Sequence, residues 1–218
     1  MTSTSTTSVQ AAAAAITSVI LEVPDPDAAG AFYCAAFGLG DQVRFRASQE
    51  PTTGFRGFTL SLVVSQPSTV DSLVGTALDA GATMIKPVKK SLWGYGGSLR
   101  APDGTIWKIA TSAKKDTGPA TRQVDDIVLL LGCADVAATK RFYVEQGLTV
   151  ARGFGSKYVE FTAPASHIKL ALYKRRALAK DAGVPPEGTG SHRIAITSDA
   201  GPFTDPDGFA WQSAPRES

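Results

Sequence analysis

The chain has 218 residues, enough for one large domain or two small ones, and its 43% hydrophobic and 19% charged residues are ordinary for a globular protein. A formal charge of +2 argues against nucleic acid or an acidic membrane as the main partner, and no apolar run approaches the ~18 residues that cross a bilayer. Residues 1–14 lack a basic leader and predict a disordered tail. The only cysteines, Cys34 and Cys133, favour reduced, buried thiols in helices and a cytoplasmic location.

The first elements along the chain are a strand and a helix. Residues 17–23 are rich in β-branched and apolar side chains, which is typical of a strand. Asp25 is a good helix N-cap and Pro26 suits a first helical turn, so we expect a helix over 27–37 that ends at Gly38. A strand therefore leads directly into a helix that ends in Phe-Tyr.

The same order of elements follows within the first half. The pattern predicts a strand over 58–64, a helix over 69–80 capped by Ser68, and a short strand over 84–87. A hairpin of strands 93–100 and 105–111 then turns at Pro102-Asp103-Gly104. Residues 15–113 are accordingly predicted to form a first unit of two βαβββ modules.

A polar stretch containing Gly-Pro, residues 114–122, is predicted to link this unit to a second one over 123–215. The second unit opens in the same way, because a strand over 126–131 precedes a helix over 133–144 in which Phe142-Tyr143 matches Phe32-Tyr33. We expect the remaining strands at 148–152, 157–162, 168–173, 191–197 and 209–213, with a basic helix over 175–182. The last two strands lie too close together for the usual helix, so the final module is predicted to be shortened.

Two sequence motifs carry a family resemblance. They are Phe32-Tyr33 with Pro102-Asp103-Gly104-Thr105-Ile106-Trp107, and Phe142-Tyr143 with Asp205-Pro206-Asp207-Gly208-Phe209-Ala210-Trp211. The chain thereby resembles the vicinal oxygen chelate superfamily of glyoxalases, bleomycin-resistance proteins and dioxygenases. The resemblance implies an α+β fold of tandem βαβββ modules whose curved mixed sheets enclose a cavity. Members isomerise, cleave, oxygenate or only sequester small molecules, so the fold leaves the function open.

The positions at which metal-using members hold their ion can be carried over to this sequence. In the first unit they fall at Ser18, Thr59 and Lys108, which are poor ligands for a divalent ion, so no metal is expected there and these residues are better candidates for ligand binding. In the second unit they fall at Asp126, His192 and Gln212, an alternative site for Zn, Fe, Mn or Ni. A lone strand histidine is more often a hydrogen-bonded structural residue, and that reading of His192 stays open.

Other polar and aromatic residues are candidates for chemistry or binding. His192 with Asp126, and separately Glu160, are candidate catalytic acid–base groups, although Glu160 also fits a solvent-facing strand position. Arg56, Trp93 and Tyr95 are candidates to hold a flat or anionic organic molecule; packing of these aromatic residues in the core or hairpin is the alternative. Gly94, Gly96 and Gly97 would allow a ligand or another backbone to approach closely.

Two functional hypotheses follow. The first is a protein that binds a small organic molecule in its cavity and needs no cofactor, and the second is a metal-dependent lyase, isomerase or dioxygenase that uses the second unit. The shortened module predicts a surface covered either by the first unit or by a second copy, which makes a homodimer possible. Small-molecule ligands are the expected partners, rather than nucleic acid or membrane.

Overall fold

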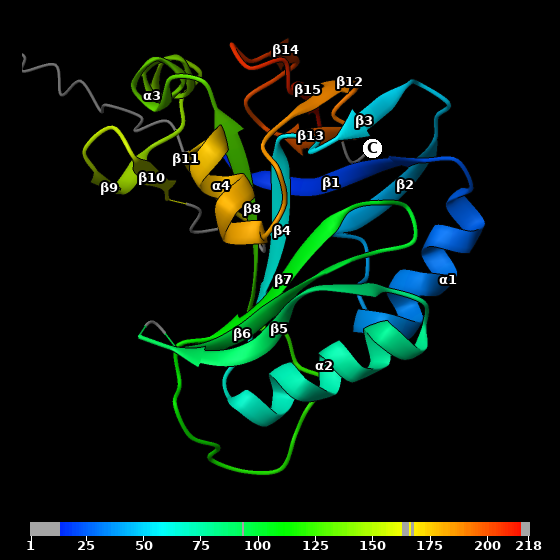
Figure 1. The fold of residues 1–218 in the computed structure, drawn as a ribbon. Helices are drawn as coiled ribbons and strands as arrows, with labels where there is room; N and C mark the ends of the chain where they lie inside the picture. The colour runs from blue at the N-terminus through cyan, green and yellow to red at the C-terminus, as the bar shows by residue number, and fades with distance from the viewer. Residues whose placement is uncertain (1–13, 93, 163–165, 167, 215–218) are drawn as a thin grey trace, which may run out of the picture.

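A computed structural model describes residues 14–92, 94–162, 166 and 168–214. In this part the chain forms an eight-stranded sheet, a five-stranded sheet and a two-stranded ribbon, together with four helices (Figure 1). No helix in the described part is long and apolar enough to cross a membrane.

The first half contains strands β1 (Ile16–Val23), β2 (Val43–Ala47), β3 (Thr52–Gly54), β4 (Phe58–Val63), β5 (Thr83–Ser91), β6 (Gly94–Arg100) and β7 (Ile106–Thr111), and helices α1 (Pro26–Phe37) and α2 (Pro67–Asp79). The second half contains strands β8 (Asp126–Cys133), β9 (Val150–Phe154), β10 (Tyr158–Phe161), β11 (Ile168–Lys174), β12 (Gly188–Gly190), β13 (Ile194–Ser198), β14 (Phe203–Thr204) and β15 (Ala210–Ser213), and helices α3 (Val136–Glu145) and α4 (Arg175–Ala182).

Each sheet is built from both halves of the chain. The eight-stranded sheet has the order β5-β6-β7-β4-β8-β11-β10-β9 and is joined at its centre by the antiparallel pair β4–β8. The five-stranded sheet has the order β14-β15-β13-β1-β2 and is joined by the antiparallel pair β1–β13, while β3 and β12 form the ribbon. The first half therefore covers the shortened final module through the β1–β13 pair. Cover by the first unit was one of the two expectations for that surface, the other being a second copy of the chain.

The two central modules are complete and the two outer ones are short. In the module β4-α2-β5-β6-β7 and in β8-α3-β9-β10-β11, the first strand lies parallel to the last. The opening module contributes only β1, α1 and β2 to its sheet, so the expectation of two complete modules in the first half needs correction. In the final module, β13 runs to β14 through a turn at residues 199–202.

Side-chain caps explain where the helices begin. The Asp25 carboxylate accepts hydrogen bonds from the backbone N–H groups of Asp27 and Ala28, and Asp135 does the same for α3. Helix α2 differs from expectation, because its N-cap is Gln66 and not Ser68. The Gln66 side chain instead binds the linker, accepting from the N–H of Gly118 at 3.1 Å, so the linker is fastened to the start of α2.

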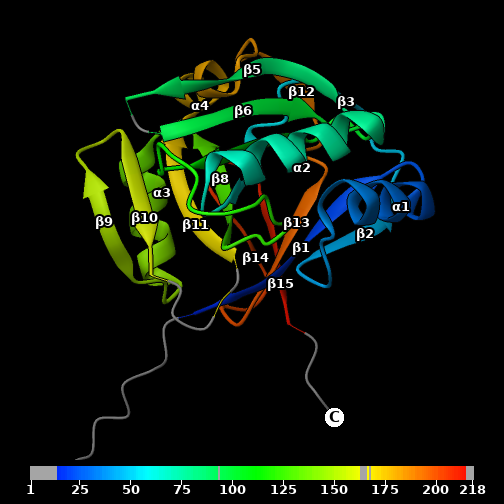
Figure 2. The ribbon, with the colours of Figure 1, turned by 90° about the horizontal axis from the view of Figure 1, so that it is seen from below.

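Helices α1, α2 and α3 pack on one face of the sheets over a common core that includes Leu60, Trp107, Leu129 and Tyr143. Figure 2 shows α2 running along β5 and β6 with α1 beside it, whereas α4 lies on the far side of these strands. We call this opposite face of the eight-stranded sheet the inner face; it carries the in-register row Lys108, Ser61, Val128 and Lys169. The two cysteines each depart from expectation in one respect. Cys133 is buried but ends β8 instead of lying in a helix, and Cys34 lies on helix α1 but is exposed.

Candidate functional site

The Phe-Tyr and Pro-Asp-Gly motifs form a buried hydrogen-bond network in the first half. The Tyr33 hydroxyl donates to Asp103 Oδ2 at 3.1 Å and accepts from Trp107 Nε1 at 3.1 Å. Thr105 donates to the same carboxylate from its backbone N–H and its hydroxyl. Burial and then the neighbouring Asp103 carboxylate raise the pKa of Tyr33 well above its usual value, so the phenol stays protonated as a donor.

The second half repeats this network with one shift. Tyr143 donates to Asp205 Oδ2 at 2.5 Å and accepts from Trp211 Nε1 at 3.2 Å. The acceptor is therefore Asp205, whose pKa is raised by burial, and not Asp207 of the Pro-Asp-Gly sequence. Asp207 instead accepts from the N–H of Ala134 and the Thr139 hydroxyl at the start of α3. In both halves the motif fastens a helix to the strands that it covers, which is a structural role.

The candidate metal positions of the first half lie in different sheets. Ser18 is buried on β1 of the five-stranded sheet, whereas Thr59 and Lys108 belong to the eight-stranded sheet. Lys108 Nζ lies 2.9 Å from Asp181 Oδ2 of α4, so this side chain forms an ion pair with the helix on the inner face.

The alternative metal set of the second half is divided in the same way. Asp126 starts β8 and pairs with Lys169 Nζ at 2.7 Å, while Gln212 lies on β15, where its amide oxygen accepts from Arg46 Nη1 at 3.0 Å in the orientation that satisfies both groups. Among the described residues, no three His, Cys, Asp or Glu side chains are grouped closely enough to hold a metal.

His192 precedes β13 rather than lying in it. Its Nδ1 is 2.5 Å from the backbone oxygen of Arg56 and its Nε2 is 3.0 Å from that of Asp207, and its ring stacks on Phe209 with centroids 4.0 Å apart. A backbone carbonyl oxygen thus lies within hydrogen-bond distance of each ring nitrogen of His192. These contacts favour the structural reading of His192, and Asp126 pairs with Lys169 rather than with this histidine.

The remaining predicted site residues are also engaged by the protein. Glu160 pairs with Arg152 at 2.6 Å on β9 and β10, and Tyr95 donates to Asp71 of α2. Arg56, whose pKa is lowered by burial, donates to the backbone oxygen of Asp103 at 2.6 Å and holds the turn of the β6–β7 hairpin. Trp93 lies outside the described residues.

The hairpin glycines serve the sheet. A Cβ on Gly94 would lie 2.0 Å from the backbone oxygen of Thr111, and one on Gly96 would lie 2.6 Å from that of Ile109. A Cβ on Gly97 would meet the backbone of β5. Another backbone therefore approaches these glycines, which was one of the two expected reasons for them.

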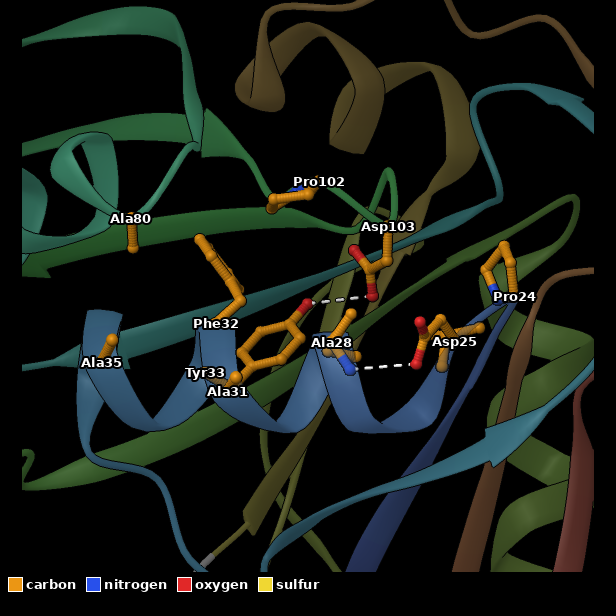
Figure 3. Close-up of a pocket in the computed structure, with 12 residues that line it drawn as sticks. Pro24, Asp25, Ala28, Ala31, Phe32, Tyr33, Ala35, Ala80, Pro102 and Asp103 are labelled. Atoms are coloured by element: carbon orange, nitrogen blue, oxygen red, sulfur yellow. Dashed lines mark hydrogen bonds between the residues drawn. The ribbon is translucent and has the colours of Figure 1, made fainter.

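A groove with a volume of about 730 Å³ runs along α1 (Figure 3). Its lining is mostly apolar and consists of Val23, Pro24, Asp25, Ala28, Ala29, Ala31, Phe32, Tyr33, Ala35, Ala80, Pro102 and Asp103. Ala28, Ala31 and Ala35 are exposed on one side of α1, and Ala80 and Pro102 form the opposite wall. Sequence analysis missed this groove, although the spacing of these three alanines marks one helical face.

The repeat-related helix α3 provides a comparison. When the two helices are matched from their N-caps Asp25 and Asp135, Arg141 corresponds to Ala31 and Glu145 to Ala35. Both charged residues of α3 are exposed. The small apolar face is therefore particular to α1.

Comparisons with known proteins agree on the architecture. No protein-family model matches the sequence, and no curated protein does either. Among solved structures, glyoxalase I from Zea mays matches with a TM-score of 0.56 at 15% identity over 91% of both chains, and its V278E mutant with 0.58 at 14% over 92% of both. A putative dioxygenase from Bacillus subtilis matches with 0.52 at 13%, over 84% of this chain and 69% of the other. The chain has the glyoxalase-like fold.

Helix α4 covers part of the inner face of this glyoxalase-like fold, the face that the family resemblance associates with ligands. Leu178, Ala179 and Ala182 are buried against Phe55 and Ile106. The end of α4 is fastened as well, because Lys86 Nζ donates to the backbone oxygens of Lys180 and Asp181 and the Ser98 hydroxyl donates to that of Ala182.

A cavity of about 260 Å³ remains beside the end of α4, with Lys86, Lys108 and Asp181 in its lining. Lys86 and Lys108 already bind α4, which leaves Lys89 as the third lysine of the lining, and the carbonyl end of the helix and the Asp181 carboxylate repel anions. This part of the inner face is therefore poorly suited to the anionic ligand that its lysines would otherwise suggest.

Proposed function

We propose that this glyoxalase-like protein binds a small, largely apolar organic molecule in the α1 groove without a metal. The observation that carries the proposal is the groove itself, whose volume of about 730 Å³ falls within the range of about 300–1,000 Å³ that is usual for ligand sites. Phe32 and Tyr33 give it an aromatic floor, and the exposed alanines of α1 leave room above that floor.

Burial of apolar surface would supply most of the affinity. A probe of about twelve heavy atoms at about 0.3 kcal/mol per atom gains about 4 kcal/mol, which corresponds to a dissociation constant of about a millimolar. Binding of a larger natural ligand is expected to be tighter, since the groove could cover more of its surface.

The side chains at the candidate metal-binding positions are engaged by other protein groups, which supports binding without a metal. Lys108 and Asp126 form ion pairs, Gln212 faces an arginine, and both nitrogens of His192 face carbonyl oxygens. No observation in the described part of the chain favours the metal-dependent lyase, isomerase or dioxygenase over a binding protein.

The test is titration of neutral naphthylmethanol, followed by its fluorescence, into the wild-type protein and Ala31→Phe. The new phenyl ring would fill the groove, so we expect binding to weaken at least about tenfold, or about 1.4 kcal/mol. Arg141→Phe places the same ring at the matching exposed position of α3 and should bind as the wild type does. Dialysis against a chelator should leave the titration unchanged. Equal binding by wild type and Ala31→Phe, or loss of binding after chelation, would overturn the proposal.

A further inference from the structure

The α1 groove has a polar end and an apolar end. Figure 3 places the carboxylates of Asp25 and Asp103 toward the end of the groove at Pro24, whereas Ala35 and Ala80 lie at the other end. Asp25 is exposed and Asp103 is half-buried, so solvent or a ligand can reach both groups. A molecule that fills the groove lengthwise would therefore place one end beside the two carboxylates.

The polar end offers hydrogen-bond acceptors rather than donors. The Tyr33 hydroxyl already donates to Asp103, and the N–H groups of Asp27 and Ala28 already donate to Asp25. Pro24 and Pro102 have no N–H. The twelve lining residues include no Lys, Arg or His, so a ligand group placed there must supply its own donors.

Neighbouring groups reduce the negative potential without removing it. Asp25 lies at the N-terminus of α1, where the helix dipole contributes roughly half a positive charge. Arg56 binds the backbone oxygen of Asp103 from outside the groove lining. With two full carboxylate charges opposed by these partial or offset positive charges, the potential favours a cation modestly and disfavours an anion.

We propose that the natural ligand is a protonated amine carried on an apolar body, with its ammonium group at Asp25 and Asp103 and its body along Phe32 and Ala35. This inference rests on the proposed function, because it assigns the ligand class of the same groove. Carboxylates and phosphates of similar size are rejected, since they would meet two carboxylates and no free donor.

The test compares naphthylmethylamine, naphthylmethanol and naphthoate, which share one ring system and differ in charge. The amine should bind about two- to fivefold more tightly than the alcohol, as expected for a partly exposed charge pair, and naphthoate should bind most weakly. Asp25→Asn keeps a good N-cap while removing the charge, so it should weaken amine binding about two- to fivefold more than alcohol binding and narrow the preference for the amine. Asp135→Asn makes the same exchange at the N-cap of α3 and should change neither.

Each result separates this inference from the proposed function. If amine and alcohol bind equally, or naphthoate binds most tightly, the ammonium assignment is overturned while binding in the groove stands. An unchanged amine preference in Asp25→Asn, with the fold intact by thermal melting, also overturns the assignment. If none of the three probes binds, the proposed function has failed and this inference with it.

Discussion

The two Tyr-Asp-Trp networks predict unequal effects of one substitution made twice. In Tyr143→Phe, the buried Asp205 loses a donor at 2.5 Å and Trp211 Nε1 loses the hydroxyl to which it donates. A hydrogen bond to a charged group contributes about 1.5–3 kcal/mol, and an unpaired buried donor costs about 1–3 kcal/mol. Together these give a loss of about 3–5 kcal/mol in the free energy of unfolding.

Tyr33→Phe should be milder because its acceptor is less isolated. Asp103 is half-buried and keeps both hydrogen bonds from Thr105, so water can replace the lost hydroxyl and only Trp107 Nε1 stays unpaired. We expect a loss of about 1–3 kcal/mol. Urea unfolding of both variants and the wild type, followed by far-ultraviolet circular dichroism, measures the difference. Equal losses, or a larger loss for Tyr33→Phe, would refute the reasoning from burial of the acceptor.

Two further predictions concern pH and α4. Burial raises the pKa of Tyr33 and Tyr143 in the folded state, so an unfolded chain releases these protons first and stability should fall as pH rises above about 10. In urea titrations from roughly pH 9 to pH 11, each Tyr→Phe replacement should reduce this decline in the free energy of unfolding by about 1.4 kcal/mol in total, and an unchanged decline would contradict the prediction. Leu178→Ala should lower the free energy of unfolding by about 2–5 kcal/mol, because it empties a buried position under α4. Lys108→Met removes only a half-exposed ion pair and should lower it by under about 1 kcal/mol. The reverse order in urea unfolding would show that charge rather than burial holds α4 in place.

Local patterns predicted much of the fold. Strand 17–23, the helix over 27–37 and the hairpin turn at Pro102-Asp103-Gly104 follow from side-chain alternation, capping and turn chemistry, which act over a few residues. The strand expected over 191–197 begins later, at Ile194, because Arg193 adopts a left-handed backbone with φ of 57°. No glycine marks that position in the sequence, so His192 was assigned to the strand.

The sequence pattern does not predict which distant strands pair with one another. Both β1 and β4 present apolar residues to the core whichever partner they choose, so the patterns do not indicate that β1 pairs with β13 and β4 with β8. This choice of partners separates Ser18 from Lys108, and Asp126 from Gln212. The groove was missed for a different reason, since an alanine-rich helix face is equally compatible with ordinary helix propensity.

The pairing of β1 with β13 has a consequence for synthesis of the protein. As the chain leaves the ribosome, β1 emerges long before its sheet partner β13, and β4 emerges before its partner β8. Neither sheet can close when the first half alone has been released, so the nascent half exposes strand edges that invite aggregation. Separately expressed halves should accordingly be poorly soluble alone and regain structure only when mixed, so the two halves would act as complementing fragments.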